Sequence, residues 1–216
     1  MRKSVFKKRL ITSIILIILI LIIFNSLYFM ISSLLILGVL SILEFLSLSQ
    51  KIYKNKIYNL LSNICFIIFV SILFLSFFIL YNFQQSKFIL LVLLAGCVAS
   101  DIGGYVFGKI FKGPKLTKIS PNKTITGSLG SFTLASITTL SLIFLETNVV
   151  NFSIFLIGLI TSLFCQLGDL FFSFLKRKAK VKDTGNFLPG HGGILDRLDG
   201  IFLGIPFGFV TLILLF

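Results

Sequence analysis

The residues of this sequence that could do chemistry on phosphate groups lie mostly in its second half, and Asp169 is the most informative of them. Ser173 follows Asp169 by four residues, and the cations Lys176 and Arg177 follow it by seven and eight. On a helix these four side chains share one face. A carboxylate can bind a metal ion, and nearby cations can neutralise the phosphate groups that the metal also binds. The spacing therefore predicts a phosphate-handling face on a helix.

A second acidic pair, Asp196 and Asp199, lies three positions apart and could share one face of another helix. Two helices that each offer carboxylates can hold Mg²⁺, which takes one or two carboxylates together with phosphate oxygens and water. The preceding segment is rich in glycine, which lets backbone amides approach a ligand closely. The single histidine, His191, would alone be structural or solvated, but among these neighbours it is expected to touch ligand. The other polar members are Lys182, Asp183 and Arg197.

Two features farther upstream add to this set. The segment 113–127 carries Lys123 and runs into the start of an expected helix, whose N-terminus would favour anions; ordinary helix capping is the alternative explanation. Asp101 lies beside a stripe of small residues that would let another helix backbone approach closely, and the acid indicates a polar seam rather than a lipid-facing surface. The stripe consists of Gly96, Ser100, Gly104 and Gly108.

The elements that must position these residues are membrane-spanning helices. The chain has 216 residues, 56% of them hydrophobic and 12% charged, whereas soluble domains carry roughly 25% charged residues. The sequence predicts an all-α, polytopic integral membrane protein, because a transmembrane helix needs about 20 mostly apolar residues. We expect the short first segment to be a retained helix, since no small-residue cleavage pattern follows it. The seven predicted spans are 10–25, 27–48, 59–81, 88–110, 125–146, 152–174 and 200–216.

Basic residues predict the orientation of these spans. With the N-terminus in the cytoplasm, seven crossings place 19 of the 20 Lys and Arg residues on the cytoplasmic side. The net charge of +13 is then explained by topology and anionic lipid rather than by nucleic acid. We divide the chain into residues 1–90, with about three transmembrane helices, and a region 91–216 that carries the chemistry and the cytoplasmic loops 109–124 and 175–199.

Three carboxylates, those of Glu44, Asp101 and Asp169, fall inside the predicted helices, toward their cytoplasmic halves. A carboxylate at membrane depth costs several kcal/mol unless it is paired, hydrated or bound to a cation. A functional site therefore competes with two structural alternatives, an intramembrane ion pair and a protonated acid that only packs.

Together these motifs resemble the phosphatidate cytidylyltransferase family, also called CDP-diacylglycerol synthases. The resemblance covers about residues 95–216, and its positions stand at the spacing of the family signature. They include the run Gln166-Leu167-Gly168-Asp169, Ser173, Lys176-Arg177, Lys182-Asp183, Gly185, Pro189-Gly190-His191-Gly192-Gly193, Asp196-Arg197 and Asp199, together with Asp101 to Tyr105 and Ser120-Pro121-Asn122-Lys123-Thr124.

The resemblance implies an enzyme of phospholipid biosynthesis in the bacterial inner membrane, with its active site facing the cytoplasm. Such an enzyme transfers a cytidylyl group from CTP to phosphatidate, giving CDP-diacylglycerol and pyrophosphate, with Mg²⁺ as cofactor; a second cation and a homodimer stay open. By the same resemblance, Asp169 and Asp196 bind the metal. The remaining catalytic residues are Lys182, Asp183, His191, Arg197 and Asp199, and the substrate-binding residues are Lys123, Ser173, Lys176, Arg177 and Asp101.

One departure from the family concerns the residues after Lys123-Thr124, where many members have an aromatic residue and then Glu-Gly. This sequence has Thr126 at the position of that glutamate, so any role of the missing carboxylate is absent, optional or covered elsewhere, for example by Glu44. Other CTP-dependent lipid enzymes, such as a polyprenol kinase, are one alternative. A transporter with intramembrane carboxylates is another, but the sequence shows no inverted repeat and its acids gather on one side.

Overall fold

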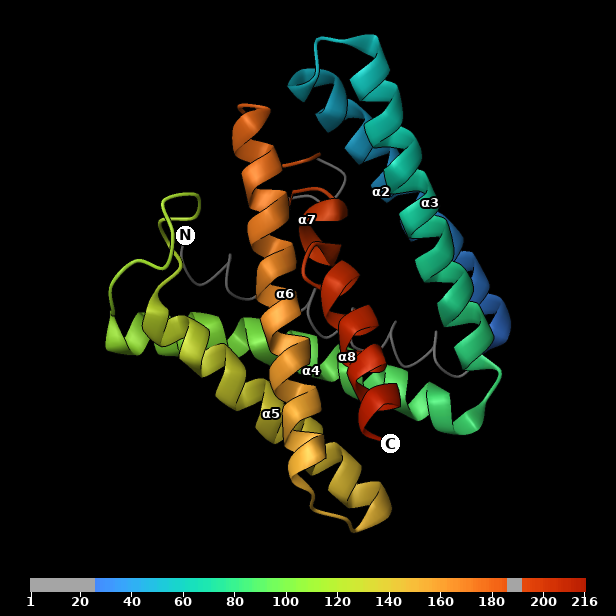
Figure 1. The fold of residues 1–216 in the computed structure, drawn as a ribbon, viewed down its shortest axis with the longest axis vertical. Coiled ribbons are helices and arrows are strands. Elements are labelled where there is room, and N and C mark those ends of the chain that lie inside the picture. The colour runs from blue at the N-terminus through green and yellow to red at the C-terminus, as the bar shows by residue number, and fades with distance from the viewer. Residues whose placement is uncertain (1–25, 186–191) are drawn as a thin grey trace, which may run out of the picture.

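The computed structural model describes residues 26–185 and 192–216, and these residues form a bundle of helices (Figure 1). Helices α6, α7 and α8 lie between an antiparallel α2–α3 hairpin on one side and the α4–α5 pair on the other (Figure 1). Residues 26–185 and 192–216 contain no β-strand, and an isolated bridge pairs Lys115 with Thr124. The helices are α2 (Leu27–Ile52), α3 (Lys56–Tyr81), α4 (Gln84–Phe111), α5 (Ile125–Thr147), α6 (Phe152–Lys178), α7 (Leu195–Leu198) and α8 (Ile201–Leu215).

The all-α membrane fold predicted from the sequence is confirmed. Six helical stretches among the described residues are long and apolar enough to cross a membrane, and each overlaps one of the last six predicted spans. The predicted span 10–25 lies outside the described residues. The last stretch begins at Leu195, earlier than the predicted start at residue 200, because Asp199 and Gly200 keep helical backbone angles and join α7 to α8.

The stripe of small residues on α4 packs against α5 and α6, as its spacing predicts. The Ser131 hydroxyl of α5 donates to the Ser100 carbonyl at 2.7 Å, and the hydroxyls of Ser100 and Ser162 of α6 are 2.8 Å apart. A Cβ added at Gly104 would lie 2.7 Å from Ser131 Oγ and would push on the hydroxyl that bonds to Ser100. Close backbone packing and interhelical hydrogen bonds are what hold helices together where lipid removes the hydrophobic driving force.

We expect Gly103→Ala to destabilise the protein by about 1–3 kcal/mol, because overpacking a tight contact forces backbone shifts. A Cβ at Gly103 of α4 would collide with the carbonyl of Gly130 on α5, which cannot move without its helix. Gly96→Ala is the matched control, since its Cβ would meet the Thr139 hydroxyl at 3.2 Å, a side-chain group. The melting midpoints of the two variants in detergent micelles test this; equal midpoints would contradict the packing argument.

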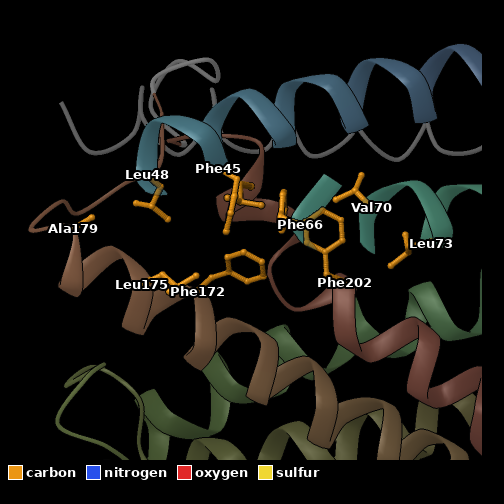
Figure 2. Close-up of a cluster of buried hydrophobic side chains, with 10 residues drawn as sticks. Phe45, Leu48, Phe66, Val70, Leu73, Phe172, Leu175, Ala179 and Phe202 are labelled. Carbon is orange, nitrogen blue, oxygen red and sulfur yellow. The ribbon is translucent and has the colours of Figure 1, made fainter. Parts of the chain in front are cut away.

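An aromatic cluster joins the α2–α3 hairpin to α6, α7 and α8 (Figure 2). Phe45 of α2 stacks on Phe66 of α3 with ring centroids 3.9 Å apart, and Phe66 meets Phe172 of α6 and Phe202 of α8 edge to face. Leu195, the first residue of α7, is fully buried in the same cluster. The hairpin therefore anchors the start of α7, where the predicted site residue Asp196 lies.

Candidate active site

The face of α6 that runs from Asp169 toward Lys176 is formed as the spacing predicts. The Ser173 hydroxyl donates to Asp169 Oδ1 at 3.2 Å, one helical turn apart. The other carboxylate oxygen of Asp169, Oδ2, forms an ion pair with the Lys123 ammonium, which comes from the segment before α5. Both side chains of this pair keep over a quarter of their surface exposed, so a substrate phosphate can reach them.

Lys176, one turn beyond Ser173, bridges the two acids of the α7–α8 segment. Its Nζ lies 2.7 Å from Asp196 Oδ1 and 3.8 Å from Asp199 Oδ2. The three side chains are only 9–13% exposed. Asp196 and Asp199 thus share one helical face, and that face meets α6 through a lysine that is largely shielded from water.

The second oxygen of Asp196, Oδ2, organises the loop that precedes α7. It accepts hydrogen bonds from the backbone N–H groups of Thr184 at 2.8 Å and Gly193 at 3.0 Å, and the Thr184 hydroxyl lies 3.1 Å away. Gly192 has φ +80°, a left-handed conformation that favours glycine, and a Cβ there would meet Asp196 Oδ2 and Asp183. The glycines predicted to cradle a ligand therefore let this segment fold tightly around Asp196.

Gly168, the neighbour of the metal candidate Asp169, lets the backbone of Asp199 approach α6 closely. A Cβ at Gly168 would collide with the Asp199 carbonyl oxygen, so α6 and the α7–α8 segment touch through their backbones here. Asp169 interacts electrostatically with both Asp199 and Asp101, and Lys123 and Arg197 offset the charge at Asp101. The acids of α4, of α6 and of the α7–α8 segment are therefore within electrostatic range of one another.

The segment that carries Lys123 is held by a short ladder of backbone hydrogen bonds. Leu116 N–H donates to the Lys123 carbonyl at 2.8 Å, and Ile125 N–H donates to the Pro114 carbonyl at 2.9 Å. Thr124 caps α5 by accepting from Gly127 N–H at 3.1 Å. Thr126, which stands where many family members have glutamate, accepts from Gly113 N–H at 3.2 Å and so secures the base of the loop.

The donors at this site fit Mg²⁺, which the resemblance to the family implies. Mg²⁺ prefers oxygen and needs only one or two carboxylates when phosphate and water supply the rest. Asp169 and Asp196 each hold a lysine ammonium on one oxygen, a position for which a metal ion would compete. Among the described residues, the other oxygen of Asp196 accepts from Thr184 N–H and Gly193 N–H, and Asp169 accepts from the Ser173 hydroxyl. Within residues 26–185 and 192–216 no three His, Cys, Asp or Glu side chains are grouped to hold a metal.

The structure therefore brings most of the predicted site residues together around α6. Arg177, Lys182 and Asp183 are exposed, with Asp183 beside Gly192. His191 lies outside the described residues. Thr184, which contacts Asp196, is not among the predicted site residues, because a threonine in a loop has many ordinary structural roles. Glu44, suggested only as a substitute for a missing acid, contacts the loop before α7 rather than the segment around Thr126.

The family model described as the cytidylyltransferase family matches residues 1–215. The chain is 34% identical over 168 residues to the phosphatidate cytidylyltransferase of Staphylococcus saprophyticus, which covers 76% of this chain and 64% of that protein. It is 47% identical over 109 residues to the phosphatidate cytidylyltransferase of Staphylococcus aureus strain COL, covering 50% of this chain and 42% of that protein. The matches thus span less than two thirds of these relatives' own length.

Proposed function

Because this chain belongs to the cytidylyltransferase family, we propose that it transfers a cytidylyl group from CTP to phosphatidate, giving CDP-diacylglycerol and pyrophosphate. The observation that carries this proposal is the pair of carboxylate–lysine contacts on one face of α6, Asp169 with Lys123 and Asp196 with Lys176. A nucleoside triphosphate needs cations for its phosphate groups, and its metal ion needs carboxylates. The names of the relatives support phosphatidate as the acceptor.

In the proposed reaction a phosphate oxygen of phosphatidate attacks the α-phosphorus of CTP, and the bond from that phosphorus to the β-phosphate oxygen breaks. The electron pair of that bond leaves with pyrophosphate. No protein nucleophile is needed, because such transfers depend on positioning and charge stabilisation. Lys123 and Arg197 hold phosphate oxygens, and Lys176 stabilises the negative charge that develops on the leaving group. Arg177 and Lys182, exposed nearby, attract the triphosphate.

Asp169 and Asp196 would hold Mg²⁺, which when bound neutralises phosphate charge and polarises the phosphoryl group. Ser173 fixes the Asp169 carboxylate through its hydrogen bond, and Thr184 and Gly193 fix Asp196. Asp101, Asp183 and Asp199 complete the acidic surroundings, and His191 is assigned to the site by resemblance alone.

The chain is an integral membrane protein, and this explains how a lipid substrate reaches the site. We assign it to the bacterial inner membrane, with the basic loops and the active site on the cytoplasmic side, because Lys and Arg collect on the cytoplasmic side of membrane proteins. Asp169 and Ser173 lie within a span, whereas Lys123 belongs to a basic connecting loop. Phosphatidate can thus keep its acyl chains in the bilayer while its phosphate meets the cations.

The experiment that tests this function uses the purified protein in mixed lipid–detergent micelles with labelled CTP, phosphatidate and Mg²⁺. We expect CDP-diacylglycerol and pyrophosphate in equal amounts, loss of both with EDTA, and their return with excess Mg²⁺. A chain that remains folded but forms no product from phosphatidate, while it transfers to a polyprenol acceptor, would overturn the proposed substrate.

A further inference from the structure

Glu44 of α2 makes contacts that neither its position in the sequence nor the reaction explains. Its Oε1 accepts from Ile194 N–H at 2.9 Å, and its Oε2 accepts from Leu195 N–H at 2.9 Å and from the Thr184 hydroxyl at 2.7 Å. A single carboxylate from the N-terminal hairpin thus satisfies three donors of the segment that leads into α7. Hydrogen bonds to a charged acceptor are roughly twice as strong as neutral ones.

Two glycines make room for this carboxylate. A Cβ at Gly193 would collide with Glu44 Oε2, and a Cβ at Gly185 would lie 2.7 Å from Glu44 Oε1. The glycines on both sides of the loop therefore serve the approach of Glu44 as well as any approach of substrate. The glutamate and the loop fit each other at several positions, which is more than an incidental surface contact would show.

The contact leads directly to the metal candidate Asp196. The Thr184 hydroxyl that donates to Glu44 also lies 3.1 Å from Asp196 Oδ2, and Thr184 N–H donates to that same oxygen. The next residue after Glu44, Phe45, packs in the aromatic cluster that buries Leu195, the neighbour of Asp196. Polar and apolar contacts from α2 thus fix both sides of Asp196.

We propose that Glu44 is a positioning residue: it fastens the segment 184–195 to α2 and so sets the orientation of Asp196 toward α6. This role rests on the proposed function for its effect on turnover, but the contact itself can be measured without any activity. Glu44 does not replace the missing glutamate at Thr126, because it acts on another loop and through other donors.

Hydrogen–deuterium exchange of Glu44→Gln in detergent micelles tests the contact. The amide replaces one acceptor oxygen by a donor group that faces N–H donors, so we expect the Ile194 and Leu195 amides to exchange at least about tenfold faster. Peptides from α6 and from the aromatic cluster should exchange as in the wild type. Glu146→Gln is the matched control, because Glu146 is the only other glutamate and stands exposed at the end of α5.

The turnover of Glu44→Gln tests whether the contact matters for catalysis. We expect kcat of Glu44→Gln to fall by about ten- to a hundredfold while KM for phosphatidate stays within about twofold, because Glu44 would orient a group that acts on the transition state rather than bind substrate. Thr184→Val, which removes the shared hydroxyl, should lower kcat in the same way. Because the two residues act through one contact, the double variant should lose less activation free energy than the sum of the losses in the two single variants.

The outcomes separate the two proposals. Unchanged exchange at Ile194 and Leu195 would overturn the contact, and faster exchange with unchanged kcat would overturn the positioning role while the proposed function stands. If the wild type has no activity, the proposed function fails and the exchange data still decide the contact. If Glu44→Gln does not fold, hydrogen–deuterium exchange and kcat are measured on Thr184→Val instead. Thr184→Val is then combined with Glu44→Asp, and additive losses of kcat on the free-energy scale would count against the inference.

Discussion

Replacing Asp169 by asparagine is expected to lower the rate of CDP-diacylglycerol formation by on the order of 10²–10³-fold, the size typical of losing one preorganised electrostatic group. Asparagine keeps the shape and can still accept from Ser173, but it loses the negative charge that pairs with Lys123 and would hold Mg²⁺. The loss should lie mainly in kcat, and raising the Mg²⁺ concentration should recover part of it. The measurement is labelled-CTP turnover of the purified variant over a Mg²⁺ titration.

The control for Asp169→Asn is Glu146→Gln, which makes the same chemical change at an exposed position. Its turnover should match that of the wild type. Equal melting midpoints for all three proteins would show that the charge, and not the fold, accounts for the loss. Turnover of a folded Asp169→Asn within about threefold of the wild type would remove Asp169 as a metal ligand, since losing even a supporting group of a metal site typically costs 10–100-fold.

Lys176→Met is expected to cause the largest loss of stability, about 3–5 kcal/mol, because it leaves Asp196 and Asp199 without their shared cation in a shielded place. For a chain of this size that corresponds to a melting midpoint lower by roughly 6–20 °C. Lys123→Met, which breaks a pair whose side chains are 26% and 30% exposed, should cost about 1 kcal/mol or less. Thermal unfolding of both variants at one scan rate in the same detergent compares them.

A double variant distinguishes the loss of charge balance from the loss of packing. Lys176→Met with Asp196→Asn removes one cation and one anion, so it should recover part of the stability that Lys176→Met loses. Equal destabilisation by Lys123→Met and Lys176→Met would contradict the argument from burial. A double variant that is less stable than Lys176→Met alone would show that Asp196 is held by its backbone donors rather than by charge balance with Lys176.

The membrane helices could be predicted from the sequence because each is a long apolar run that ends in polar residues. The predicted start of the last one, residue 200, is too late, because the charged side chains of Asp196, Arg197 and Asp199 interrupt the apolar run although their backbone is helical. Those polar residues are tolerated near the start of a span because Lys176 neutralises two of them. A hydropathy profile does not take such an ion-pair partner into account.

The face of α6 could be predicted because Asp169, Ser173 and Lys176 are local neighbours with helical spacing. The partners of Glu44 could not, because two of them are backbone N–H groups, which every residue except proline carries. The sequence marks Glu44 as unusual, an acid in an apolar helix, but gives no sign of what it binds. The role of Thr184 is hidden for a similar reason, since a threonine in a loop has many ordinary explanations.

The separation of Glu44 from its donors has a consequence for synthesis of the protein. Residues 44 and 194 are 150 positions apart, so at ribosomal rates of 5–20 residues per second Glu44 waits roughly 8–30 s for the amides that will bind it. During that time α2 carries a carboxylate without its final partners, which is costly at membrane depth until the partners arrive. The loop around Asp196 can form its hydrogen bonds to Glu44 only after residues 194 and 195 have left the ribosome. The reaction centre is therefore assembled late, when most of the bundle is already in the bilayer.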